Sequence, residues 1–139
     1  MAANTNPIYP LTPKNIEAQL TNASGTTAVT VYTAGVNGAR VDSLSLTNSD
    51  TVAHDVALII NNGTTDYTVG TFAVAIGAGT ASTIPAKAVL SDSNITCTVS
   101  DPFGNKVLYL QANYVLKLAM VSGLASAKVA NAAGLAGDF

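Results

Sequence analysis

Hydrophobic and polar residues alternate over much of the chain from Ile16 onward. In residues 55–61, for example, Val56, Leu58 and Ile60 occupy every second position. An alternation of period two places the apolar residues on one face of a half-buried β-strand. The same kind of pattern predicts strands over residues 27–33, 40–48, 55–61, 67–76, 95–99, 107–112 and 114–121.

Turn-forming residues separate these predicted strands. The pairs Asn37-Gly38 and Asn62-Gly63 favour tight hairpin turns, because both residue types tolerate positive φ. Residues 101–104 read Asp-Pro-Phe-Gly, which places proline second and glycine fourth in a β-turn. Short strands between closely spaced turns are typical of a sandwich or a barrel. We therefore predict an all-β, single-domain antiparallel sandwich of about eight strands, with jelly-roll or Greek-key topology.

The two ends of the chain are less regular. Pro7, Pro10 and Pro13 lack a backbone N–H and favour extended backbone before them, so residues 1–13 are predicted to form an extended N-terminal arm. Residues 14–139 are then the β-sandwich domain. The arm also carries three apolar side chains that gain from burial, on its own domain or on a partner: Ile8, Tyr9 and Leu11. Near the other end, alanines and glycines are mixed, and we favour a final strand over residues 127–132.

The amino-acid composition predicts a protein surface that carries little charge. Only 10% of the 139 residues are charged, and the net charge is −2. Weak self-repulsion favours permanent packing against neighbouring proteins, although a neutral monomer would show the same composition. The Lys and Arg residues are scattered, which argues against a nucleic-acid surface and against a basic membrane helix. Neither a signal peptide nor an apolar membrane span is apparent, so we expect synthesis in a reducing cytoplasm.

Chemically reactive side chains are few. The chain has one His and one Cys, and Glu17 is its single Glu. This count argues against a His-based triad and a multi-histidine metal site, and we expect His54 to be a surface or edge residue. Most aspartates fall at turns, where Asp has backbone roles, and Cys97 sits in an alternating run as a buried small hydrophobe. We therefore expect no enzyme, no catalytic residue, no metal and no cofactor.

Three segments of the sequence resemble a known group of proteins. The opening, residues 4–14, reads Asn-Thr-Asn-Pro-Ile-Tyr-Pro-Leu-Thr-Pro-Lys, and residues 31–44 read Val-Tyr-Thr-Ala-Gly-Val-Asn-Gly-Ala-Arg-Val-Asp-Ser-Leu. The chain ends on Ala-Gly-Asp-Phe, residues 136–139. Together these segments are similar to small head cement, or decoration, proteins of tailed phages. The resemblance implies a jelly-roll head stabilisation protein.

What the resemblance implies about function fits the missing chemistry. Such a bacteriophage protein is a structural virion protein that binds the outer surface of an assembled capsid. It clamps neighbouring major capsid subunits, often as a homo-oligomer, a dimer or a trimer, and contacts neither nucleic acid nor membrane. Our hypothesis is that the arm and the last two residues make the protein contacts, although Phe139 could instead fold back onto its own sandwich. The proposed contact residues are Pro7, Ile8, Tyr9, Pro10, Leu11, Pro13, Asp138 and Phe139.

Two other classes of function stay open at this point. One is a tail- or receptor-associated β module of a phage particle, which would present an exposed aromatic or charged ligand site. Its aromatic supply is low, because Phe, Trp and Tyr make up 6% of the chain and Trp is absent. The other is a hydrolase on a jelly-roll scaffold, which would need paired carboxylates facing one groove.

Overall fold

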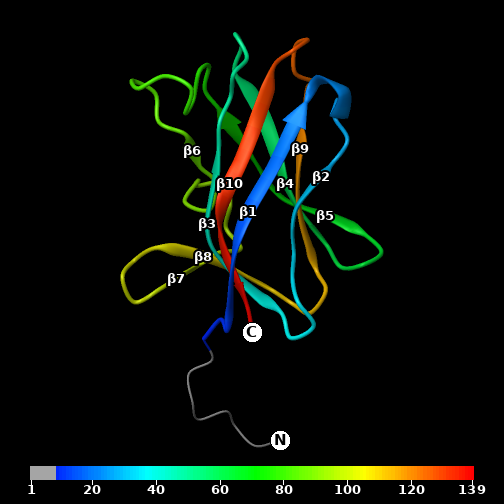
Figure 1. Cartoon of the computed structure of the whole chain (residues 1–139), viewed down its shortest axis with the longest axis vertical. Coiled ribbons are helices and arrows are strands. Elements are labelled where there is room, and N and C mark those ends of the chain that lie inside the picture. Colours follow the sequence, from blue (N-terminus) through cyan, green and yellow to red (C-terminus); the bar gives the residue numbers. More distant parts are fainter. Residues whose placement is uncertain (1–8) are drawn as a thin grey trace, which may run out of the picture.

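The computed structural model describes residues 9–139, which fold as two antiparallel β-sheets packed face to face (Figure 1). The six-stranded sheet has the order β1-β10-β3-β8-β7, with β6 also paired to β3. The four-stranded sheet has the order β2-β9-β4-β5. The strands are β1 (Thr12–Thr21), β2 (Val29–Thr33), β3 (Ala39–Leu46), β4 (His54–Asn61), β5 (Asp66–Val74), β6 (Lys87–Ala88), β7 (Val99–Ser100), β8 (Lys106–Leu110), β9 (Val115–Met120) and β10 (Val129–Asp138).

The long strands pair in a nested way. β1 pairs with β10, β2 with β9, β3 with β8 and β4 with β5. Eight of the described strands have five or more residues, while β6 and β7 have two each. The prediction of an all-β antiparallel sandwich with about eight strands is therefore confirmed. Within residues 9–139 the only helical element is a 3₁₀ turn (Asn22–Ser24), and no helix there is long and apolar enough to cross a membrane.

The core fills the space between the two sheets. Period-two alternation supplies it, since Leu44 and Leu46 of β3 are buried while Ser45 between them is only half-buried. β4 and β9 contribute Val56, Leu58, Leu116 and Leu118 from the opposite sheet, and each is fully buried. Such burial of a Leu or Val side chain stabilises the fold by about 1.5–3 kcal/mol per residue.

The predicted strands agree with the structure in most places. The predictions over residues 27–33, 40–48, 55–61, 67–76, 107–112 and 114–121 correspond to β2, β3, β4, β5, β8 and β9. The predicted strand over residues 95–99 is wrong except at Val99, where the short strand β7 begins. Its first part follows a series of turns, in which Ile95 N donates to Asp92 O (3.0 Å) and Asn94 N to Asp92 Oδ1 (2.9 Å). Because those bonds satisfy the backbone locally, this segment needs no neighbouring strand.

Only some of the predicted turns have the predicted form. Asn37-Gly38 does not form a hairpin, because β2 and β3 lie in different sheets and a β-turn closed by Gly38 N and Gly35 O (3.0 Å) connects them. Asn62-Gly63 does lie in the β4–β5 hairpin, but the loop is four residues long and is closed by Asn62 N and Thr65 O (3.2 Å). The β-turn at residues 101–104 is confirmed, since Gly104 N donates to Asp101 O (3.0 Å).

Both ends of the chain are more ordered than the sequence pattern indicates. β1 begins at Thr12, so the last two residues of the predicted arm belong to the sheet. Pro7 and Ile8 lie outside the described residues. The final strand is also longer than the predicted 127–132, because β10 continues to Asp138 and lies between β1 and β3.

Candidate protein-binding surface

The two ends of the described chain meet at one end of the sandwich. Figure 1 shows the C-terminus beside the start of β1, at the bottom of the view. Thr12 is paired with Asp138, and one step further Leu11 N donates to Asp138 O (2.7 Å). Pro10 packs so closely on Gly137 that a Cβ added there would lie 2.4 Å from the proline ring. The start of the chain is therefore held against its last residues.

Asp138 is bound within its own domain. Its carboxylate accepts hydrogen bonds from Tyr32 Oη (2.6 Å) and Gly35 N (3.0 Å), and it forms an ion pair with Lys14. Burial alone would raise the pKa of this carboxyl group, but the bonds from Lys14 and Tyr32 lower the pKa below its ordinary value. Burial and the same carboxylate raise the pKa of the Tyr32 hydroxyl. With three partners in its own domain, Asp138 positions the two ends of the described chain.

Phe139 also lies on its own sandwich. Its backbone N donates to Gly38 O (3.2 Å), and its carbonyl accepts from Asn37 Nδ2 (3.3 Å). The phenyl ring is stacked on Tyr109, with centroids 6.2 Å apart and planes 7° apart. Tyr109 stays 54% exposed, so the stacked pair forms part of the surface.

An arginine and a leucine extend this surface across the outer face of the six-stranded sheet. The register places Arg40 of β3 between Gly137 of β10 and Tyr109 of β8. Leu135 lies two residues before Gly137 and is also exposed. We call the combined surface the terminal patch: Tyr9, Leu11, Arg40, Tyr109, Leu135 and Phe139. Exposed aromatic residues beside an arginine are the composition found at the centres of protein interfaces.

The terminal patch includes only part of the predicted contact set. Tyr9 and Leu11 are exposed, Pro10 packs on Gly137, and Pro13 is an exposed residue of β1. Arg40, Tyr109 and Leu135 were missed by the sequence reasoning. A signal for Tyr109 was present, because Leu108 and Leu110 share the inward face of one strand and the aromatic residue between them must point outward.

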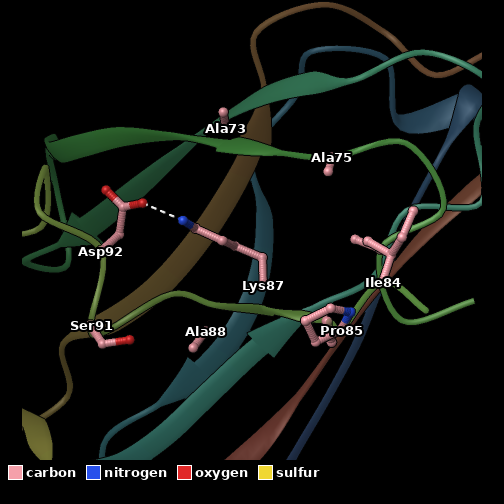
Figure 2. A pocket seen from close by; sticks show the side chains of 10 residues that line it. Ala73, Ala75, Ile84, Pro85, Lys87, Ala88, Ser91 and Asp92 are labelled. Carbon is pink, nitrogen blue, oxygen red and sulfur yellow. Dashed lines mark ion pairs between the residues drawn. The ribbon is translucent and has the colours of Figure 1, made fainter. Parts of the chain in front are cut away.

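A separate pocket of about 380 Å³ lies beside the edge strand β5. In Figure 2, Ala73 and Ala75 line one side, while Lys87 and Asp92 point toward each other and form an ion pair. Most of the other lining groups are small or apolar, including Ile84. The lining has no nucleophile paired with a base, so its chemistry supports apolar contact rather than a reaction.

Three expectations about reactive residues need correction or comment. Cys97 is exposed, because its segment is not a strand, and partial desolvation raises the pKa of its thiol. His54 is buried rather than at the surface, and it contacts Asp50 and Ser122. The count of one histidine therefore did not exclude a Ser-His-Asp arrangement, since such an arrangement needs only one. Residues 9–139 contain no group of three or more His, Cys, Asp and Glu side chains placed to hold a metal ion.

Comparisons with known proteins found no relative of this chain. No family model matches the chain, and neither a curated protein nor a solved structure matches it. The resemblance to phage head proteins thus rests on the three sequence segments quoted above. A functional conclusion has to come from the terminal patch, the fold and those segments.

Proposed function

We propose that this chain is a structural virion protein of a phage, which binds the outer surface of an assembled capsid and clamps neighbouring major capsid subunits. The observation that carries the proposal is the terminal patch. It combines exposed Tyr9 and Leu11 with the Tyr109–Phe139 stack and Arg40, at the end of the sandwich where the two ends of the described chain meet. A cement role requires such a contact surface on a rigid scaffold and requires no catalytic group.

The fold supports the same proposal at a finer level. The nested pairing of β1 with β10, β2 with β9, β3 with β8 and β4 with β5 is the winding expected of a jelly roll. We take the sandwich to be a jelly roll on this basis. Jelly rolls are frequent in proteins of viral particles, so the topology agrees with the resemblance of residues 4–14, 31–44 and 136–139.

The low charge of the chain is the second support. With 10% charged residues and a net charge of −2, copies repel one another weakly when they crowd on a shell. Many copies on one lattice also bind with avidity, so each contact can be modest. We propose a homo-oligomer, a dimer or a trimer, as the bound unit.

The first experiment mixes the purified protein with capsids assembled without it and measures co-sedimentation and capsid melting. We expect binding at a fixed copy number and a higher melting temperature of the capsid, because a ligand of the assembled state stabilises that state. Capsids that neither bind the protein nor gain stability would contradict the proposal. In that case binding to isolated tail proteins or to host glycans would favour the tail- or receptor-associated module.

A matched pair of variants then tests the terminal patch. Leu135→Glu places a charge on the patch at a residue that is 53% exposed. Val121→Glu places the same charge outside the patch, at a 57% exposed residue that follows β9 and lies beside the start of β4. We expect Leu135→Glu to weaken capsid binding at least tenfold, about 1.4 kcal/mol, and Val121→Glu to leave it unchanged. Equal binding by both variants would move the contact surface away from the terminal patch. Deleting residues 1–8 tests the rest of the predicted arm and keeps all of β1.

A further inference from the structure

Asp50, His54 and Ser122 form a continuous line of contacts at the end of the sandwich opposite the chain termini. Asp50 lies in the β3–β4 connection, His54 opens β4, and Ser122 follows β9. The distance from Asp50 Oδ2 to His54 Nε2 is 3.0 Å, and that from His54 Nδ1 to Ser122 Oγ is 3.4 Å. The Asp50 and His54 side chains are 1% and 3% exposed, whereas Ser122 is exposed to solvent.

The neighbours of Asp50 determine which nitrogen of His54 carries the proton. The carboxylate also accepts hydrogen bonds from Thr51 N (2.6 Å) and Ala125 N (2.8 Å). The bond from Ala125, together with that from His54, lowers the pKa of Asp50 to about 2, so the group is ionised and can only accept. In neutral His54 the Nε2–H must then donate to Asp50, which leaves the Nδ1 lone pair facing the Ser122 hydroxyl. A serine, a histidine base and a carboxylate that orients the base thus contact one another in that order in space.

Ser122 and the next residue, Gly123, are exposed to solvent. Within residues 9–139, the backbone N–H groups of Gly123 and Leu124 have no hydrogen-bond acceptor. N–H groups that directly follow a nucleophile are the donors that often stabilise an oxyanion. Val121 directly precedes Ser122, and Val52 lies midway between Asp50 and His54 in the sequence; both are more than half exposed and offer apolar contact.

We infer that Ser122 is an activated nucleophile that accepts acyl groups from small activated esters. Ser122 Oγ forms a bond to the acyl carbon while its proton passes to His54 Nδ1. The ester C–O bond then breaks, and the leaving alcohol takes that proton. Water repeats the sequence on the acylated serine, which releases the acid and restores the hydroxyl. This activity is independent of capsid binding, and it departs from our expectation of no catalytic residue.

The test treats the full-length protein with a fluorophosphonate probe and with p-nitrophenyl acetate. We expect the probe to label Ser122, located by mass spectrometry, and the ester to be hydrolysed above the buffer rate. Ser122→Ala should abolish labelling and return hydrolysis to the buffer rate, while retaining the wild-type melting temperature because Ser122 is exposed. Ser126→Ala is the matched control in the same connection, and it should behave as the wild type.

A second variant separates activation from simple exposure. His54→Gln removes the base and should slow labelling of Ser122 about 100-fold, the usual contribution of a positioned general base. The proposal is overturned if Ser122 labels no faster than Ser126. It is also overturned if Ser122→Ala hydrolyses the ester as fast as the wild type. Ser122→Ala decides the matter if His54→Gln does not fold.

Discussion

Buried polar side chains organise the connections at the end of the sandwich opposite the termini. Within the described residues, the buried polar or charged residues are Asn48, Asp50 and His54. Asn48 Nδ2 donates to Val52 O (2.9 Å) and Ala75 O (3.2 Å), so it joins two connections. Asp50 joins a third through Ala125 N. Each buried group has its hydrogen-bond partners, which makes the loss of any one of them costly.

Asp50 makes stability depend on pH in a defined range. Its folded pKa of about 2 is below the ordinary value of 3.8. The ionised group therefore contributes its full stabilisation above about pH 4, and the contribution disappears as pH falls toward 2. We predict that Asp50→Asn is less stable than the wild type near neutral pH, and that the difference shrinks between pH 4 and pH 2. Urea unfolding at several pH values measures this, and a constant difference across that range would contradict it.

Asp138 is likewise an aspartate that accepts several hydrogen bonds, at the end of the sandwich where β1 begins. Asp138→Asn removes the ion pair with Lys14 and weakens the bonds from Tyr32 and Gly35. We predict a loss of about 1–3 kcal/mol in the free energy of unfolding, as for other hydrogen bonds to a charged group. Asp42→Asn is the control, because its more exposed pair with Arg40 should contribute less than about 1 kcal/mol. Urea denaturation of both variants tests the ranking, which equal losses would refute.

At the scale of elements, β10 depends on a residue without a side chain. Gly134 is paired with Leu44 in the interior of the six-stranded sheet, and a Cβ added to it would lie 2.1 Å from Ser43 O. Because backbone on both strands must move to relieve that contact, Gly134→Ala should cost about 1–3 kcal/mol. Gly123→Ala is a suitable control, since its added Cβ meets nothing closer than 3.7 Å. Thermal unfolding compares the two, and similar melting temperatures would contradict the prediction.

The irregular segment before β7 leaves the thiol of Cys97 accessible to solvent. Because Cys97 is exposed in the folded protein, we predict that one equivalent reacts with a disulfide reagent such as DTNB without denaturant. The raised pKa of its thiol should make the reaction slower than that of free cysteine at the same pH. Absorbance at the product wavelength follows the reaction. If labelling required urea, the buried position expected from the alternating sequence would be correct.

Local patterns predicted most strands, and pairing between distant segments decided the rest. Residues 55–61 alternate strongly, so β4 was predictable almost to its ends. β10 was predictable only in part, because alanine and glycine carry weak preferences and its length is set by β1 and β3 beside it. The strand predicted over 95–99 shows the converse, since alternation occurs there without a partner strand.

For the candidate sites too, local sequence patterns indicated some residues, and contacts between distant segments supplied the others. Exposed Tyr9 and Leu11 could be proposed from the proline-spaced opening alone. The Tyr109–Phe139 stack could not, because it brings together residues from β8 and the chain end. The contact between His54 and Ser122 joins positions 68 residues apart, and no local spacing indicates it.

At the scale of the whole molecule, each nested pair except β4–β5 joins segments far apart in the sequence. Closing such long loops costs entropy before the contacts that stabilise them can form. We predict refolding on a timescale of milliseconds to seconds, as for other sandwiches with mostly non-local pairing. Stopped-flow dilution from urea measures the rate, and refolding within microseconds would be inconsistent with this topology.

The position of β10 has a consequence for how the protein is made. The last strand of the chain is an interior strand, with β1 on one side and β3 on the other. During translation, β1 leaves the ribosome long before β10 and has no partner strand until residues 129–138 emerge from the exit tunnel. A nascent chain therefore cannot close its larger sheet before that point, and a polypeptide that stops before residue 129 has unpaired strands on both sides of the gap. Such products are expected to be aggregation-prone and to be cleared by cellular proteases, so chains that contain β10 would persist longer.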